Sequence, residues 1–260
     1  MLKILKYTLF DLLRSRWSYL YFAFYLVFTA ALLFLSGDVS KVVVSLMNVI
    51  LILSPLIATM FGVMYYYNSR DFIELLLAQP LRRTHIFWGQ YLGVALSLSV
   101  SLLLGIGIPF TFYGIFHAAG LGHFLTLLMD GIILSFIFSG IAFLIALRHE
   151  NKIKGFGLAI LMWLFFAVIY DGLVLMLLIW FRDYPLEATS LGLALFNPID
   201  LSRILILLQL DISALMGYTG AVFQKFLGSQ MGMLLSFGAL LLWLLFPAWG
   251  IRQSALAKDF

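Results

Sequence analysis

Six apolar stretches, each about as long as a lipid bilayer is thick, most constrain what this chain can fold into. They cover about 17–36, 42–67, 86–116, 123–147, 155–181 and 233–251. A membrane-spanning helix needs roughly 20 mainly apolar residues. Only 11% of the 260 residues are charged, whereas a soluble domain carries about 25%. The sequence therefore predicts an all-α polytopic membrane protein, a single transmembrane domain over residues 1–260 with six transmembrane helices.

Positive charge is unevenly divided between the two sides that these spans define. Twelve of the sixteen lysines and arginines fall at the two termini and in the 68–85 and 148–154 loops. The other side has four, namely Lys41, Arg182, Arg203 and Lys225. Because cytoplasmic loops are enriched in lysine and arginine, both termini and the 68–85 segment are expected in the cytoplasm. We expect a multi-pass protein of the bacterial inner membrane.

The N-terminal segment 1–16 is amphipathic. Leucines at positions 2, 5, 9, 12 and 13 share one helical face, and polar residues at 3, 7, 11 and 14 share the other. This pattern is typical of a helix that lies in the membrane interface. The alternative is a frayed first turn of the first span.

A second segment that does not span lies on the outer side, at 182–232. Asn197 is a suitable N-cap for a helix that opens with Pro198. The uninterrupted apolar part, 204–210, is too short to cross a bilayer. We expect an outer amphipathic or re-entrant segment. A seventh span is the competing interpretation, although it would place the two termini on opposite sides.

The cytoplasmic segment 68–85 has the features of a short helix. Asn68 is a candidate N-cap with Asp71 three residues later, and Glu74 also lies near the start, where negative charge favours the helix dipole. Pro80 is expected to end the helix. Apolar residues cover most of the remaining surface of this helix, and its two acids stand in an otherwise basic loop. Both features suggest that the helix docks on a partner protein whose apolar surface has a basic rim. An amphipathic loop resting on lipid is the alternative. The residues expected to contact a partner are Asp71, Phe72, Glu74, Leu75, Leu76, Gln79 and Arg82.

Small residues recur at every fourth position of the third span. They are Gly89, Gly93, Ser97, Ser101 and Gly105. This spacing lets helix backbones approach closely. It predicts a packing seam against a neighbouring helix or against a second copy of the chain.

Two acids lie inside spans, Asp130 in the fourth and Asp171 in the fifth. A charge at the bilayer centre costs about 2.5–3.5 kcal/mol even on lenient scales, so such residues usually face a cavity or a partner. The predicted topology puts both acids in the outer half at similar depth. They are candidates for the lining of a substrate path, and hydrogen bonding to neighbouring helices is the alternative.

The sequence also excludes several chemistries. It has no cysteine, so disulfides and thiolate metal sites are excluded on this chain. No G-x-x-x-x-G-K-[ST] motif is present, so ATP is not bound by a P-loop here, and an ATP-driven activity needs another chain. His117 and His123 flank an outer loop near Met129, and imidazole and thioether both suit copper. Their spacing is not that of a metal site, and we assign no metal, no catalytic residue and no nucleic-acid surface.

With these elements in place, the chain resembles the ABC-2 type permeases of ABC transporters. The stretches that carry the resemblance are "FIELLLAQPLRRTHIFWGQYLG" at 72–93, "NPIDLSR" at 197–203 and "LLLWLLFPAWGIRQ" at 240–253. They look most like the NosY-type branch, the permeases of the transporter that helps mature the copper centres of nitrous oxide reductase. The Gly-Thr that often precedes Glu-Leu-Leu-Leu in the family is absent here.

The resemblance implies a homodimer and two copies of a cytoplasmic ABC ATPase. The ATPase, which would hold ATP and magnesium, would dock on a coupling helix near residues 70–80. In the NosY-type branch a periplasmic β-helical protein sits on the outer face and a copper-carrying lipoprotein cooperates with it. The outer residues expected to contact such a partner are Asn197, Asp200 and Arg203.

Three functional hypotheses follow. The first is a non-catalytic permease subunit that couples ATP hydrolysis to export or to conformational signalling on the outer side, in copper-centre maturation or for an unrelated substrate. The second keeps this architecture without a substrate path, so that the chain only transmits motion or anchors its partners. The third is a membrane-embedded enzyme that uses Asp130 and Asp171 as acid and base, which requires the two carboxyls to lie within a few ångströms.

Overall fold

The computed structural model describes residues 1–36, 39–114, 121–181, 187–210 and 217–257. Every regular element in these ranges is a helix. In chain order they are α1 Leu2–Leu13, α2 Arg16–Ser36, α3 Val39–Asn68, α4 Arg70–Leu77, α5 Arg83–Phe112, α6 Leu121–Arg148, α7 Lys152–Leu164, the π-helical turn η2 Phe165–Ile169, α8 Tyr170–Trp180, α9 Glu187–Leu195, α10 Pro198–Gln209 and α11 Gly217–Ala257.

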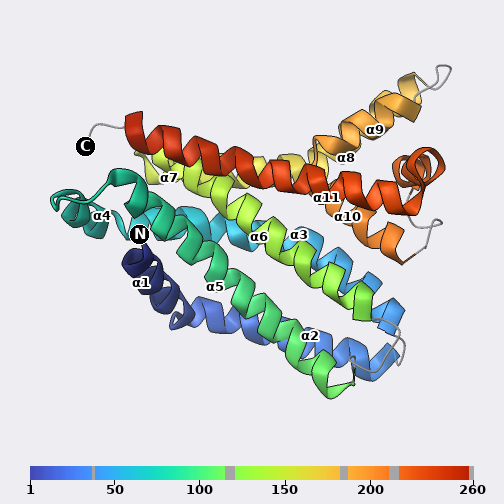
Figure 1. Ribbon diagram of the computed structural model, residues 1–260, viewed down its shortest axis with the longest axis horizontal. Helices are drawn as coiled ribbons and strands as arrows, with labels where there is room; N and C mark the ends of the chain where they lie inside the picture. Colours follow the sequence, from blue (N-terminus) through green and yellow to red (C-terminus); the bar gives the residue numbers. More distant parts are fainter. Residues whose placement is uncertain (37–38, 115–120, 182–186, 211–216, 258–260) are drawn as a thin grey trace.

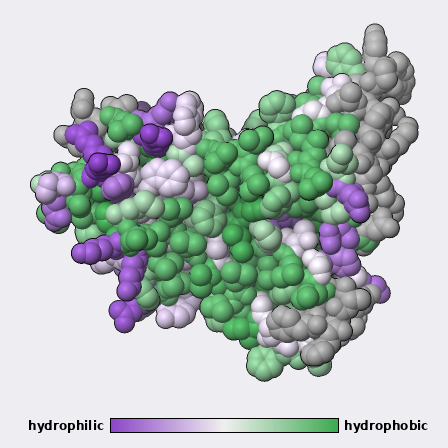
Figure 2. All heavy atoms as spheres, in the orientation of Figure 1, coloured by the Kyte–Doolittle hydropathy of each residue, from purple (hydrophilic) through white to green (hydrophobic). Residues whose placement is uncertain are grey.

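Six of these helical segments are long and apolar enough to cross a membrane, as the sequence predicts. They are α2, α3, α5, α6, the continuous run α7–η2–α8, and residues Gln230–Leu256 of α11. Figure 2 shows hydrophobic residues across the middle of the molecule and hydrophilic residues gathered mainly at one end. That end carries α4, the start of α1 and the end of α11 (Figure 1). We call it the terminal side, and the opposite end the far side.

The core lies where α3, α5 and α6 pack together, with α10 and α11 closing it toward the far side. A short polar chain crosses this core between three spans. The Tyr21 hydroxyl of α2 donates to Ser54 Oγ of α3 at 3.4 Å, and Ser54 Oγ lies 2.9 Å from Ser135 Oγ of α6. In an apolar medium each hydroxyl needs such a partner, so these hydrogen bonds fix the register of the three helices.

Helix α1 is separate from α2. It ends at Leu13, with Arg14 as its C-cap, and it packs along α5 more than along α2. Its buried residues are Ile4, Thr8 and Leu12, which recur every fourth position and form one stripe. Of the leucine face identified in the sequence, Leu12 lies in this stripe and the leucines at 5, 9 and 13 are half-buried, whereas Leu2 is 77% exposed.

The long fifth span is interrupted by η2, a π-helical turn. Such turns mark helix irregularities and are frequent at functional sites. Beyond it, α8 has no buried residue and diverges from the bundle (Figure 1). Only 6% of the most apolar stretch of α7–α8 is buried within this chain, against 72% for α6.

The predicted outer segment 182–232 contains α9, α10 and the first part of α11. Helices α9 and α10 meet at an angle of 110°, so they form either a re-entrant hairpin or one broken span. Asn197 is the N-cap of α10, since its Oδ1 accepts a hydrogen bond from the Ile199 amide at 3.0 Å, and Pro198 follows as the first helical residue. Nine residues of α10 are buried against α3, α6 and α11. Helix α10 is thus part of the packed bundle, and of the two predicted forms of the segment, amphipathic or re-entrant, its packing favours the re-entrant one.

Candidate functional site

Helix α4 lies on the terminal side, directly after α3 (Figure 1). The N-cap is Ser69, whose side chain makes no capping hydrogen bond. The prediction that Asn68 caps this helix is wrong: Asn68 is the last residue of α3, and its Oδ1 accepts a hydrogen bond from Lys152 Nζ at 3.2 Å. Asp71 occupies the first turn, as expected from the helix dipole.

The inner face of α4 attaches the helix to the bundle. Ile73 and Leu76 are buried, and Leu76 packs with Ile4 of α1 and Ile86 of α5. Phe72 stacks on Tyr7 of α1 with 5.0 Å between ring centroids. Helical register puts positions 72, 73 and 76 on one side, so α4 packs against α1 and α5 through that side.

The outer face of α4 is exposed and carries both charge and apolar surface. Leu75 is 67% exposed, and Arg70 Nε lies 3.2 Å from Glu74 Oε1 in an exposed ion pair. Five of the seven residues predicted to contact a partner are on the surface, namely Asp71, Glu74, Leu75, Gln79 and Arg82. The prediction needs correction for Phe72 and Leu76, which pack against the chain itself.

The small-residue stripe of α5 is occupied from within the chain. A Cβ added at Gly89 would lie 3.0 Å from Ile4 Cβ, and one at Gly93 would lie 2.5 Å from Thr8 Cγ2. The two glycines therefore let α1 approach the α5 backbone closely.

Farther along the stripe, Gly105 does the same for α2. A Cβ there would lie 2.8 Å from Tyr25 Cβ. The hydroxyls of Ser97 and Ser101 donate to carbonyls of α5, those of Val94 and Ser97, at 2.8 and 2.9 Å. Of the two partners left open by the sequence, a neighbouring helix or a second copy, these contacts favour the neighbouring helices α1 and α2.

Asp171 belongs to a polar cluster between α8 and α10. Arg203 Nη1 lies 3.3 Å from Asp171 Oδ2 and 3.1 Å from Asp200 Oδ1. Asn197 Nδ2 donates to Asp200 Oδ2 and to the Phe166 carbonyl, both at 3.0 Å. The cluster joins the π-helical break to the start of α10. Asn197 is buried, so it is not a surface contact for an outer partner, whereas Arg203 remains 35% exposed.

Asp130 is in a different environment. It is fully buried in α6, and neither carboxylate oxygen has a hydrogen-bond partner among the described residues. Asp171 is paired with Arg203 instead. The structure therefore does not join Asp130 and Asp171 in a hydrogen-bonded acid–base pair, which removes the geometric support for the enzyme hypothesis.

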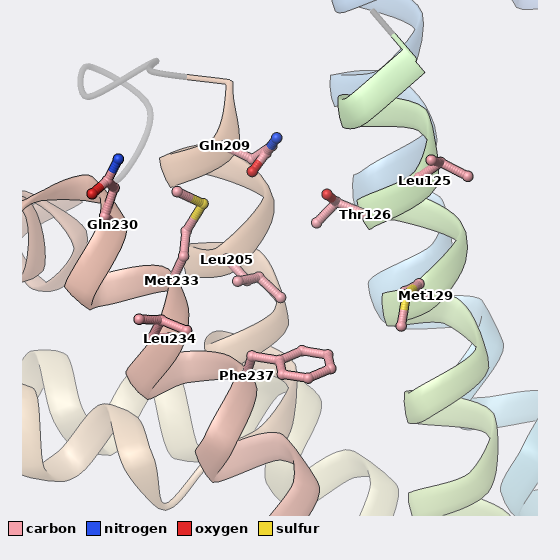
Figure 3. A pocket seen from close by; sticks show the side chains of 9 residues that line it. All are labelled: Leu125, Thr126, Met129, Leu205, Gln209, Gln230, Met233, Leu234 and Phe237. Carbon is pink, nitrogen blue, oxygen red and sulfur yellow. The ribbon is translucent and has the colours of Figure 1, made fainter. Parts of the chain in front are cut away.

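A pocket of about 550 Å³ opens between α6 on one side and α10 and α11 on the other, near the far side (Figure 3). Its lining is mostly apolar and includes the two thioethers of Met129 and Met233. Gln209 and Gln230 lie at the end of the pocket drawn uppermost, and Phe237 points across the gap at the opposite, deeper end. No pattern in the sequence indicates this pocket, because one wall comes from α6 and the other from α10 and α11, which are distant from α6 in the chain.

The histidine–methionine hypothesis for copper gains no geometric support. His117 lies outside the described residues, and the part of the chain that is described contains no group of three or more histidine, aspartate or glutamate side chains that could hold a metal.

Comparison with known proteins finds two similar chains. No family model matches the chain. A protein of Pseudomonas aeruginosa named "Probable ABC transporter permease protein NosY" is 28% identical over 184 residues, which is 68% of this chain and 67% of the relative. A protein of the same name from Stutzerimonas stutzeri is 26% identical over 267 aligned residues, covering 95% of this chain and 92% of the relative. The chain resembles the NosY-type ABC transporter permeases.

The likeness extends over almost the whole length of this NosY-like chain, and it agrees with the six spans seen in the structure. It supports a multi-pass membrane permease subunit of an ABC transporter. A permease of this class works together with an ABC ATPase.

Proposed function

We propose that this NosY-like chain receives the motion of a separate cytoplasmic ATPase at α4 and conveys it to the far side of the membrane. The observation that carries the proposal is the division of α4 into two faces. Its inner face is fixed to α1 and α5, and its outer face is exposed, with mixed charge and a leucine at its centre. A helix held this way transmits a push on its outer face to the helices behind it.

The packing supplies a route for that motion. Helix α4 bears on α1 and α5 through Leu76, Ile4 and Ile86. Close contacts at Gly89 and Gly93 then join α1 to α5 so tightly that the pair moves as one body. Helix α5 packs on α2 and α6, and α6 packs on α10 and α11 at the far side. Small displacements in such a chain of packed helices become rigid-body shifts.

We further propose that two copies of the chain associate through α7 and α8. This span contacts its own chain least, and α8 exposes large apolar side chains such as Leu173, Met176 and Ile179. The bilayer covers the remaining apolar surface. Helices α1 and α2 cover the small-residue stripe of α5, so the dimer contact is not assigned to that stripe.

On the strength of the resemblance, we assign the outer event to copper-centre maturation of nitrous oxide reductase in the bacterial inner membrane. The outer partners would then be a periplasmic β-helical protein and a copper-carrying lipoprotein. Export of an unrelated substrate is the alternative. The complete burial of Asp130 favours signalling by motion over a charged path through that residue.

Reversing the charge on the outer face of α4 tests the docking proposal. The double variant Asp71→Lys, Glu74→Lys changes two exposed side chains and leaves the inner face intact, so the permease should insert and fold normally. Co-purification of a co-expressed cognate ABC ATPase should fall at least tenfold, and permease-stimulated ATP turnover should fall with it. The matched control is Lys154→Glu, an exposed charge reversal on the same side in α7. Equal ATPase recovery from the double variant and the control would refute docking at α4.

A further inference from the structure

Three buried polar side chains, those of Asp130, Ser202 and Ser236, lie near the deeper end of the pocket between α6, α10 and α11. Asp130 follows Thr126 by four residues in α6, Ser202 precedes Leu205 by three in α10, and Ser236 follows Met233 by three in α11. Residues three or four apart share a helical face. Thr126, Leu205 and Met233 line the pocket, and so do Met129 and Phe237, the sequence neighbours of Asp130 and Ser236. The three polar residues therefore form a layer at the level of its deeper end.

All three of these deeper side chains are fully buried and unsatisfied. The side-chain oxygens of Asp130, Ser202 and Ser236 have no hydrogen-bond partner in the part of the chain that the structure describes. Helices α6, α10 and α11 pack against one another, so the three residues stand on helices that surround the same pocket. A hydroxyl in a spanning helix ordinarily donates to a carbonyl of the preceding turn, as Ser135 does to Gly131, and Ser202 and Ser236 do not.

Among the side chains that the structure describes, which leave out those of residues 211–229 and hence Lys225 of α11, no cation hydrogen-bonds to Asp130. Arg203 of α10 is engaged by Asp171 and Asp200. The other described titratable side chains on α6, and on the helices that pack against it, lie toward the ends of those helices. They are Lys41, Tyr65, Tyr66 and Tyr67 of α3, Arg83 and His85 of α5, Lys152 and Lys154 of α7, Arg252 of α11, and His123 and Arg148 of α6. Tyr91 of α5 donates its hydroxyl to the Phe136 carbonyl.

An isolated carboxylate buried this way is costly. Transfer of an unpaired charge from water to an apolar interior is so unfavourable that the group takes up a proton instead. The neutral acid can donate a hydrogen bond, whereas the carboxylate can only accept.

We propose that Asp130 is a proton-binding site: the closed packing of α6 against α10 and α11 holds its carboxyl neutral, and separation of these helices at the pocket lets water reach it and take the proton. Met129, the residue before Asp130, already lines the pocket, so a small widening suffices. The proton passes from the carboxyl to water in the pocket and returns when the helices close. This inference does not depend on the ATPase partner.

Infrared spectroscopy of the protein reconstituted in lipid at neutral pH tests the protonation. The wild type should show the high-frequency carbonyl band of a neutral aspartic acid, shifted by ¹³C labelling of aspartate carboxyls. Asp130→Asn, which matches the shape of the neutral acid, should lose that band. The matched control is Asp171→Asn, whose carboxyl is paired with Arg203, and it should keep the band. Absence of the band from the wild type, or its survival in Asp130→Asn, overturns the proposal.

A second set of variants keeps the test decisive if Asp130→Asn does not fold. The band must then persist in both Asp171→Asn and Asp200→Asn, and its loss in either one assigns the proton elsewhere and overturns the proposal. The route is tested by Phe237→Ala, which removes the ring at the deep end of the pocket. After transfer to D2O the isotope shift of the band should develop faster in Phe237→Ala than in the wild type, and at the wild-type rate in Leu242→Ala, an exposed position of the same helix. Equal exchange rates in these two variants refute the pocket as the route of water.

Discussion

The contact between α1 and α5 at Gly93 gives the sharpest mechanical prediction. In Gly93→Ala the new Cβ would lie 2.5 Å from Thr8 Cγ2 and 2.6 Å from Thr8 Cβ. Ordinary carbon–carbon contact is about 3.5–4.0 Å, so the helices must separate by roughly 1 Å. Thr8 is fully buried and β-branched, hence stiff, and cannot turn away. Overpacking of this kind costs about 1–3 kcal/mol.

Gly107→Ala is the matched control. It lies in the same helix, and a Cβ added there meets nothing within 4 Å. Both substitutions bring the same gain in helix propensity, up to about 1 kcal/mol, so the difference between the two variants isolates the clash.

Amide hydrogen exchange over residues 2–13, followed by mass spectrometry in detergent or nanodiscs, reports how often α1 opens. Exchange should be about 5-fold to about 150-fold faster in Gly93→Ala than in Gly107→Ala, because each 1.4 kcal/mol corresponds to a factor of ten. The α4 amides should follow, since Leu76 rests on Ile4 of α1. Equal exchange in the two variants would refute the close α1–α5 contact and the route of motion built on it.

Two further predictions concern the α8–α10 cluster and its surroundings. Arg203→Met leaves Asp171 and Asp200 without their shared cation. The free energy of unfolding should fall by about 1–3 kcal/mol, a value between those for exposed and for buried ion pairs, and a thermal melt measures the change. Arg70→Met, which breaks only the exposed pair with Glu74, should change it by no more than about 0.5 kcal/mol, and equal losses would contradict a structural role for the cluster. Trp243→Phe removes the indole donor that bonds the Leu195 carbonyl at 2.9 Å, so exchange in α9 should rise several-fold, and an unchanged rate would contradict that tether.

The spans could be predicted from the sequence because the bilayer sets their length. Every backbone polar group in lipid must be paired within the segment, so an apolar run of about 20 residues has little choice but to form a helix. Asn197 and Pro198 likewise located the start of α10, since capping depends on adjacent residues. The burial of α10 was missed because its apolar run is too short to span, and only its packing among three other helices makes it part of the bundle.

The candidate sites show where local reasoning ends. The existence of α4 follows from its composition, but the face on which Phe72 lies depends on Tyr7, which is 65 residues away in sequence. Asp130 and Asp171 look alike in sequence, each a single acid in an apolar span. The structure separates them through Arg203, which reaches one and not the other. Partner choice between distant helices is tertiary information that neither spacing nor hydropathy contains.

The use of the α5 stripe within the chain bears on how two copies can meet. Because α1 and α2 occupy the glycines at 89, 93 and 105, a second copy cannot approach that face without displacing them. The least covered span is then α7–α8, which is also the span broken by η2. Motion that enters at α4 would travel through α5 and α6 to α10, and Arg203 of α10 holds Asp171 just beyond the break. A shift of α10 would therefore bend α8 at η2, and in a dimer joined along α8 that bend would change the arrangement of the two copies on the far side.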